Sequence, residues 1–242
     1  MLKEKFYQAT NELFQKVRET QDCAIKQAAQ IVADAVEKGA NIHLFDTGHI
    51  IDSEIINRAG GFVLLKKFKY GITVESPTRI RNDMEKDKSL AGLAALALKA
   101  GNVYPGDVMF IGSVSGKSEN VIDLALACQE YGVTTIGISS HEYSSQLESL
   151  HPSNKRLYEI VDLAIDNCAP HGDGMLSVEG IEKSFIPASG LAAAYIMWAM
   201  NAVLLELLLE KGITPGIYGS INYPGNREYN EKLEKTYQEK GY

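Results

Sequence analysis

The residues best suited to binding an anion form the run Gly112-Ser113-Val114-Ser115-Gly116-Lys117-Ser118. This run follows the apolar segment 108–111 and opens a segment of helical periodicity, 117–131. Hydroxyls and free backbone N–H groups converge at such a strand-to-helix turn, where the helix dipole favours negative charge. One alternative is that Ser115 or Ser118 only caps the helix. Three serines and a glycine within six residues favour phosphate binding, because phosphate oxygens accept several hydrogen bonds at once.

The same run differs from two nucleotide-binding motifs. A P-loop needs Gly-x-x-x-x-Gly-Lys-Ser/Thr, and here Gly112 and Gly116 are one residue too close together. The dinucleotide fingerprint is missing as well, because Gly48 stands alone after the first expected strand. The expected ligand is therefore phosphorylated but is not held as a nucleotide.

A second polar turn, Asp46-Thr47-Gly48-His49, ends the expected strand 42–45. Glu54 follows in an expected helix, 52–59, and could move a proton between adjacent carbons of a sugar. Because Glu54 and Arg58 are four residues apart, a surface ion pair is the alternative interpretation.

The other candidate site residues stand at the ends or in the middle of expected elements. Ser139 and Ser140 end the fourth strand, and Ser189 begins the last long helix; each could instead be only a cap. Asn201 interrupts that apolar helix, so we expect it to face a partner, a polar network or the site. The pair His171 and Asp173 lacks a third ligand at a recognisable spacing, so we predict no metal and no cofactor.

The elements that must position these residues alternate along the chain. A long helix over 4–38 precedes strands that alternate with helices, which predicts βαβ units and a parallel sheet covered on both faces. We expect an α/β fold, a three-layer αβα sandwich, with ligands beyond the carboxyl ends of its five strands. The expected domains are an N-terminal helical segment, a phosphosugar-binding domain and a polar C-terminal tail, at residues 1–38, 39–212 and 213–242. The expected strands are 42–45, 62–65, 108–111, 133–138 and 160–165.

Composition excludes several classes of partner. The net charge of −7 over 242 residues argues against nucleic acid and anionic membranes. The apolar run 191–209 contains Asn201 and Glu206, which favours a buried helix over a membrane span. Three widely spaced cysteines and a start without an apolar core lead us to expect a cytoplasmic protein.

The runs Ser113-Val114-Ser115-Gly116-Lys117-Ser118 and Thr47-Gly48-His49, each after a strand, resemble the sugar isomerase (SIS) domain family. The order of elements over 36–212 is similar too, and the stretches 151–159 and 166–170 resemble an uncharacterised bacterial branch of that family. The resemblance implies a flavodoxin-like five-stranded parallel sheet and a phosphosugar whose phosphate lies on the three serines. It also implies a site between subunits, and therefore a homodimer or homotetramer.

A branch that isomerises heptose phosphates has a Glu-Leu-x-Gly-Arg segment similar to Glu54-Ile55-Ile56-Asn57-Arg58, which makes Glu54 the candidate base. Asp46 and Ile50 depart from that family's first turn, and Asn201 stands near the position of a family histidine. Asn cannot relay a proton at neutral pH. The sequence therefore leaves three hypotheses: an aldose–ketose phosphate isomerase or related lyase, a non-catalytic phosphosugar-binding or regulatory protein, and a structural partner that uses the polar tail.

Overall fold

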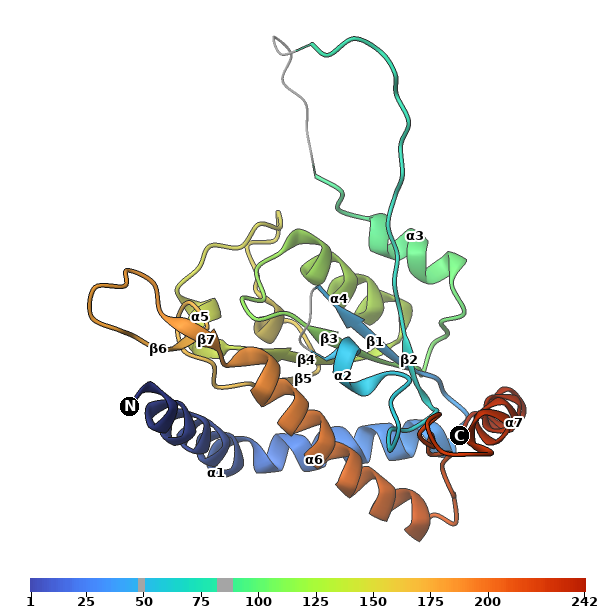
Figure 1. Cartoon of the computed structure of the whole chain (residues 1–242). Coiled ribbons are helices and arrows are strands. Elements are labelled where there is room, and N and C mark those ends of the chain that lie inside the picture. Colours follow the sequence, from blue (N-terminus) through green and yellow to red (C-terminus); the bar gives the residue numbers. More distant parts are fainter. Residues whose placement is uncertain (48–50, 82–88) are drawn as a thin grey trace.

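A computed structural model describes residues 1–47, 51–81 and 89–242, and its centre is a five-stranded parallel sheet (Figure 1). The strand order β2-β1-β3-β4-β5 is that of flavodoxin-like folds. The predicted parallel sheet is therefore confirmed. The strands are β1 (Ile42–Asp46), β2 (Leu65–Lys67), β3 (Val108–Gly112), β4 (Thr134–Ser139) and β5 (Leu163–Asp166).

Helices cover both faces of the sheet, which makes the three-layer αβα sandwich expected from the sequence. Successive strand residues point to opposite faces, so Val108 and Phe110 of β3 pack with one layer and Met109 and Ile111 with the other. The first layer holds α1 (Leu2–Glu37) and α6 (Ser189–Glu210), and the second holds α3 (Leu93–Ala100) and α4 (Glu119–Tyr131).

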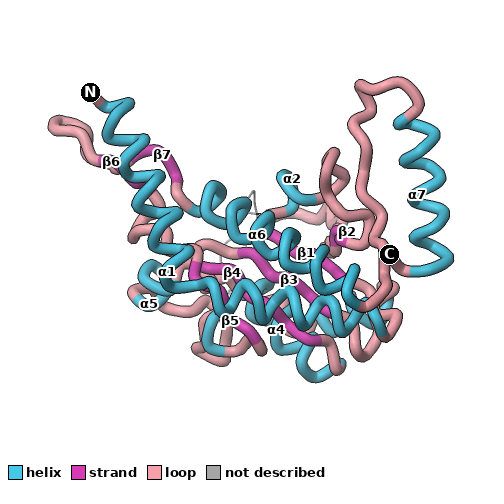
Figure 2. Tube along the Cα trace, turned by 90° about the horizontal axis from the view of Figure 1, so that it is seen from below, coloured by secondary structure: helices cyan, strands magenta, loops and turns pink. Residues whose placement is uncertain are grey.

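The two long helices of the first layer pack on each other beneath the sheet (Figure 2). Phe14 of α1 stacks on Tyr195 of α6, with ring centroids 4.5 Å apart and an interplanar angle of 11°. Buried residues of α1 belong to the same hydrophobic cluster as the inner residues of the sheet. The first helix is thus part of the core of the α/β unit.

Two elements near β1 differ from their predicted bounds. The helix α2 (Asp52–Ile55) is a single turn that ends before Asn57, which has a φ of 53°. The predicted strand 62–65 lies at Leu65–Lys67 instead, because Phe62 forms an antiparallel bridge with Ile217 of the tail. The backbone before β2 is therefore paired with residues from the other end of the chain.

The tail is structured, which its polar composition did not predict. Helix α7 (Asn226–Lys240) lies beside the β2 edge of the sheet and contributes the buried side chain of Tyr237 (Figure 2). Leu233 and Tyr237 recur at helical spacing, a signal too sparse among charged residues to predict a helix.

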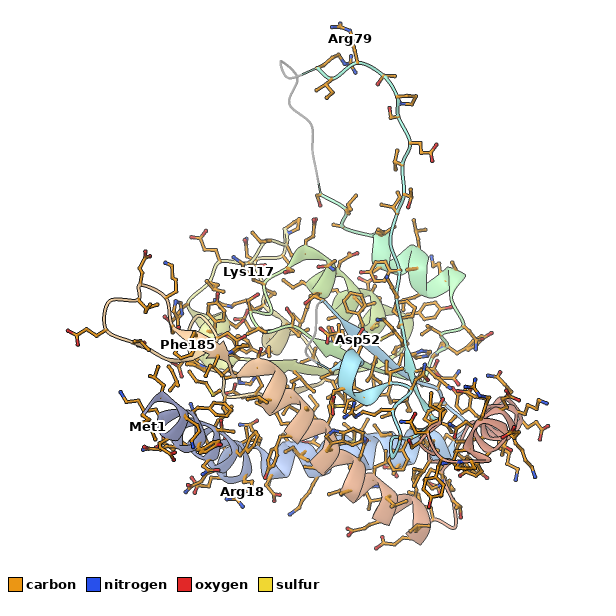
Figure 3. All side chains as sticks on the ribbon, in the orientation of Figure 1. Met1, Arg18, Asp52, Arg79, Lys117 and Phe185 are labelled. Carbon is orange, nitrogen blue, oxygen red and sulfur yellow. The ribbon has the colours of Figure 1, made fainter. Side chains whose placement is uncertain are left out.

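Three further segments connect the main elements. The segment between β5 and α6 contains a hairpin of β6 (Gly174–Leu176) and β7 (Phe185–Pro187). The segment after β2 is irregular over its described residues, where it extends away from the body with Arg79 near its tip (Figure 3). The short helices are α5 (His141–Ser145) and η1 (Leu157–Glu159).

Candidate functional site

The Ser-rich loop leaves β3 at the topological switch point of the sheet. From β1 the chain adds β2 on one side and then β3 on the other, so the strand order reverses between β1 and β3. In such folds this reversal leaves a crevice at the carboxyl ends of the strands, where ligands bind. The turn after β1 and the loop after β3 are joined there, because the Thr47 amide donates to the Gly112 carbonyl at 3.4 Å. The two polar turns singled out from the sequence are therefore neighbours.

Ser113 and Gly116 shape the loop from within. The buried Ser113 hydroxyl accepts a hydrogen bond from the Gly116 amide at 3.3 Å, and its own amide donates to the Ile138 carbonyl at 3.0 Å. Gly116 has a φ of +57°, and a Cβ there would lie 3.1 Å from Leu157 Cβ and 3.2 Å from Ser144 Oγ. A residue with a side chain would strain this turn and press on both neighbours.

The outer face of the loop is rich in unused donors. Ser118 is the N-cap residue of α4 by position, but its side chain makes no cap hydrogen bond. Among the described residues, the Ser115 hydroxyl and the Lys117 ammonium also have no hydrogen-bond or ion-pair partner. The amides of these three residues make no backbone hydrogen bond within the described chain either. Hydroxyls, amides and a cation at a helix N-terminus together suit a phosphate.

Beside this loop, the ends of β4 and β5 bury several polar side chains. The Ser140 hydroxyl is fully used, because it donates to the Ala169 carbonyl at 2.6 Å and accepts from the Tyr143 amide at 3.1 Å. Among the described residues, the hydroxyls of Ser139 and Ser144 are buried without a hydrogen-bond partner. Such a buried group costs about 1–3 kcal/mol, so this edge of the sheet has polar groups that the described part of the chain does not satisfy.

The turn after β1 is occupied by an acidic side chain. Asp46 Oδ2 accepts hydrogen bonds from the amides of Ile51 at 2.5 Å and Asp52 at 3.3 Å. Thr47 is exposed and lines a cavity of about 290 Å³ that also contains Lys67, Lys69 and Asn120 among its walls. Gly48 and His49, both predicted to bind the ligand, lie outside the described residues.

Glu54 lies on the single-turn helix α2, which follows β1, and forms an ion pair with Arg58. Its Oε1 is 3.1 Å from the Arg58 Nε, and 38% of the Glu54 side chain is exposed. The arrangement realises the surface ion pair that the four-residue spacing allows. The exposed fraction also leaves the carboxylate accessible to a substrate, so its role as a base stays a prediction.

The two candidates on α6 have different surroundings. Ser189 is bound by Asp173, whose carboxylate accepts from the Ser189 amide and hydroxyl, each at 2.8 Å. An acidic side chain therefore already occupies the N-terminus of α6. Asn201 lies about 18 Å further along that helix. Only 5% of it is exposed, and both polar atoms of its side-chain amide have no partner among residues 1–47, 51–81 and 89–242.

His141 is a candidate that the sequence did not single out. It follows Ser140 at the carboxyl end of β4, and its Nε2 is buried with no hydrogen-bond partner in the described part of the chain. Burial lowers the pKa of His141, against a smaller opposing effect of the Asp166 charge. The signal that could have found it is its position directly after the paired serines at a strand end.

The comparisons with known proteins agree with this geometry. The sequence model of the SIS domain matches residues 5–140. A UPF0309 protein of Geobacillus kaustophilus is 34% identical over 238 residues, which cover 98% of this chain and 94% of that protein.

Two solved structures share the fold at low sequence identity. A putative phosphosugar isomerase involved in capsule formation from Bacteroides fragilis has a TM-score of 0.51 and 12% identity, over 87% of this chain and 90% of its own. The phosphoheptose isomerase of Neisseria gonorrhoeae has a TM-score of 0.51 and 14% identity, over 86% of this chain and 98% of its own. The family match, together with the strand order and the Ser-rich loop at the switch point, shows that the chain belongs to the SIS domain family.

Proposed function

We propose that this protein binds a phosphosugar and acts on it as an aldose–ketose phosphate isomerase or a related phosphosugar lyase. The observation that carries the proposal is the outer face of the loop after β3. There the Ser115 and Ser118 hydroxyls have no intramolecular partner among the described residues and stand at the N-terminus of α4. The net charge of −7 means that such local donors, not the overall field, must hold the phosphate.

Glu54 is the proposed base. Isomerisation needs a group that removes a proton from the carbon next to the carbonyl and returns it to the neighbouring carbon. Glu54 comes from the segment after β1, which flanks the same switch-point crevice as the loop after β3. Arg58 lies beside this carboxylate, with its Nε 3.1 Å from the Glu54 Oε1.

Hydrogen exchange tests this role. Wild-type protein incubated with a panel of hexose, hexosamine and heptose phosphates in D₂O should introduce deuterium at the carbon next to the carbonyl. Glu54→Gln should lower the rate of that exchange at least 100-fold, which is in the range of general-base effects. Glu182→Gln, which removes an exposed carboxylate in the β6–β7 loop, is the matched control. Equal exchange by wild type and Glu54→Gln would exclude Glu54 as the base.

A second function, non-catalytic phosphosugar binding or regulation, is favoured by one observation. Asp46 takes the amide donors at the turn after β1, where a ligand would otherwise be held. Under this alternative the panel contains a ligand that binds but exchanges no hydrogen with solvent. Detectable turnover of any bound phosphosugar would exclude it.

We further propose a homodimer or homotetramer built on α6. Of the described helices, α6 alone is long and apolar enough to cross a membrane, and less than half of its apolar window is buried. Its outward side chains recur at alternating steps of four and three residues, as in helix–helix seams. We infer that a second copy covers this stripe, although Phe14 of α1 already covers one face of the Tyr195 ring. The stripe consists of Leu191, Tyr195, Trp198, Ala202, Leu205 and Leu209.

Light scattering tests the assembly. Leu191→Glu with Leu209→Glu, at positions 38% and 52% exposed, should convert the oligomer to a monomer. Leu150→Glu, at a position 62% exposed outside the stripe, should leave the mass unchanged. A wild-type monomer at micromolar concentration would overturn the proposal.

We propose a cytoplasmic location. All three cysteines have free thiols, which supports a reducing compartment. Recovery of the native protein from the periplasmic fraction or culture medium would contradict this location.

A further inference from the structure

A second cavity lies at the opposite end of the strands from the Ser-rich loop. Its volume is about 730 Å³, and it is bounded by the start of β1, by the loop between α3 and β3, by β2 and by the last turns of α7. Several of its walls come from the tail, which packs against this edge of the sheet (Figure 2). None of the residues assigned to the phosphosugar site lines it.

One member of a buried His–Asp pair, His43, lines this cavity. His43 Nε2 lies 3.0 Å from Asp107 Oδ2, and the Asp107 carboxylate also accepts from the amides of Asn41 and Tyr104, both at 2.9 Å. Because the carboxylate can only accept, Nε2 carries the proton of this hydrogen bond, and Nδ1 is the ring nitrogen left for a ligand. Nδ1 has no protein partner within the described chain, and His43 lines the cavity.

The cations that line the cavity are already neutralised. Lys66 Nζ donates to both carboxylate oxygens of Glu234, at 2.9 and 2.8 Å, and lies 4.4 Å from the centroid of the Tyr237 ring. Lys67 forms an ion pair with Asp52. The remaining charged walls, Lys240 and Glu239, have opposite signs. The cavity therefore has no excess positive charge with which to select an anion.

Neutral hydrogen-bonding groups and aromatic rings remain. The side-chain amides of Asn102 and Gln238 have no hydrogen bond within the described chain, and Asn41 uses only its Oδ1, which accepts from the Tyr237 hydroxyl at 3.4 Å. Phe68 and Tyr237 supply the rings. An amide both donates and accepts, as a hydroxyl group does, and an aromatic face packs against C–H groups.

From this combination we propose a second binding site, for a neutral polyhydroxylated ligand, that is, an unphosphorylated sugar or a polyol. Its amides and the His43 Nδ1 would bond the ligand hydroxyls, and the rings would contact the carbon skeleton. The site is separate from the phosphosugar site and does not depend on the function proposed for it.

Calorimetry with glucose, galactose, mannose, N-acetylglucosamine and sorbitol tests the site on the full chain. We expect at least one of these probes to bind with a Kd below about 10 mM, and saturating inorganic phosphate not to displace it. Asn102→Ala with Gln238→Ala should weaken that binding at least tenfold; both side chains are exposed, so the fold should persist. Gln8→Ala with Gln15→Ala removes two exposed amides on α1 and should change nothing.

Three results would overturn the proposal. The first is that none of the five probes binds. The second is that the Asn102/Gln238 double variant binds as tightly as wild type. The third is that inorganic phosphate competes with the neutral probe, which would place the probe at the Ser-rich loop instead.

Discussion

At the carboxyl ends of the strands the Ser115 and Ser118 hydroxyls have no protein partner among the described residues, whereas at the amino ends Asp107 accepts three hydrogen bonds. Both regions are polar, and both belong to the same sheet. At the amino end the Asp107 carboxylate bonds the His43 ring and the Asn41 amide and so joins β1 to β3. At the carboxyl end the hydroxyls of Ser139 and Ser144 are buried and have no partner within the described chain.

This difference separates groups that stabilise the fold from groups that await a ligand. A paired buried carboxylate raises the free energy of unfolding, and removing one partner leaves the others unsatisfied. An unpartnered hydroxyl contributes nothing to the free protein, so its removal should affect binding more than stability. Substitutions at the two ends should therefore have opposite signatures.

The largest effect is expected at the amino end. Asp107→Ala should lower the free energy of unfolding by about 3 kcal/mol, because the buried His43 ring and two amides lose their acceptor. Denaturant unfolding measures this, with Glu182→Gln on the exposed β6–β7 loop as a control that should show no change. If Asp107→Ala lowers the free energy of unfolding by less than about 0.5 kcal/mol, the amino end does not stabilise the fold more than the carboxyl end does.

The same carboxylate predicts a pH dependence. Burial alone would raise the pKa of Asp107, but the His43 hydrogen bond and the two backbone amides outweigh it, and the pKa lies below its ordinary value of 3.8. The stabilisation is therefore complete above that value and is lost as pH falls through the lower, folded-state pKa. Wild type should lose stability relative to Asp107→Ala below about pH 4. Parallel pH profiles for the two proteins would contradict this.

The next largest effect is expected in the loop itself. Gly116→Ala should cost about 2 kcal/mol, because the left-handed backbone strains a side chain and the new Cβ meets Leu157 and Ser144. Gly180→Ala is the matched control, with a φ of +80° and open space around it, and should cost about 1 kcal/mol. Equal free energies of unfolding for the two variants would show that contacts with Leu157 and Ser144 do not fix the conformation of the loop after β3.

The smallest effect compares two adjacent serines. Ser140→Ala should destabilise by about 1 kcal/mol, since its hydroxyl caps α5 and donates to Ala169. Ser139→Ala should leave the free energy of unfolding unchanged or slightly raised, because its buried hydroxyl has no partner in the part of the chain that the structure describes. A larger loss for Ser139→Ala than for Ser140→Ala would contradict the assignment of the carboxyl end to a ligand.

Much of the scaffold could be predicted from apolar runs and turn residues. The strand at 108–111 and the helices at 117–131 and 189–211 lie within two residues of their observed bounds. The Ser-rich loop followed from these elements, because strand ends in a parallel sheet meet at one edge. These features depend on residues that are close together in the sequence.

Features that depend on distant residues could not be predicted. The bridge between Phe62 and Ile217 moves β2 beyond its apolar run, and no local pattern encodes a pairing across such a separation. The bond from Asp173 to Ser189 and the pair of His43 with Asp107 are likewise tertiary contacts. Helix α7 was missed for another reason, because its buried face is little more than Leu233 and Tyr237.

The central claim is that the Ser115 and Ser118 hydroxyls hold the phosphate of a sugar phosphate. Calorimetry with a panel of hexose, hexosamine, heptose and N-acetylmuramic acid phosphates tests it most directly. Ser115→Ala with Ser118→Ala should weaken binding of the best ligand at least tenfold, about 1.4 kcal/mol, while the free energy of unfolding stays constant. The control Ser177→Ala with Ser184→Ala, at exposed positions of the β6–β7 loop, should bind as wild type does. Unchanged affinity in the Ser115/Ser118 double variant, or no binding of any panel member by wild type, would contradict the claim.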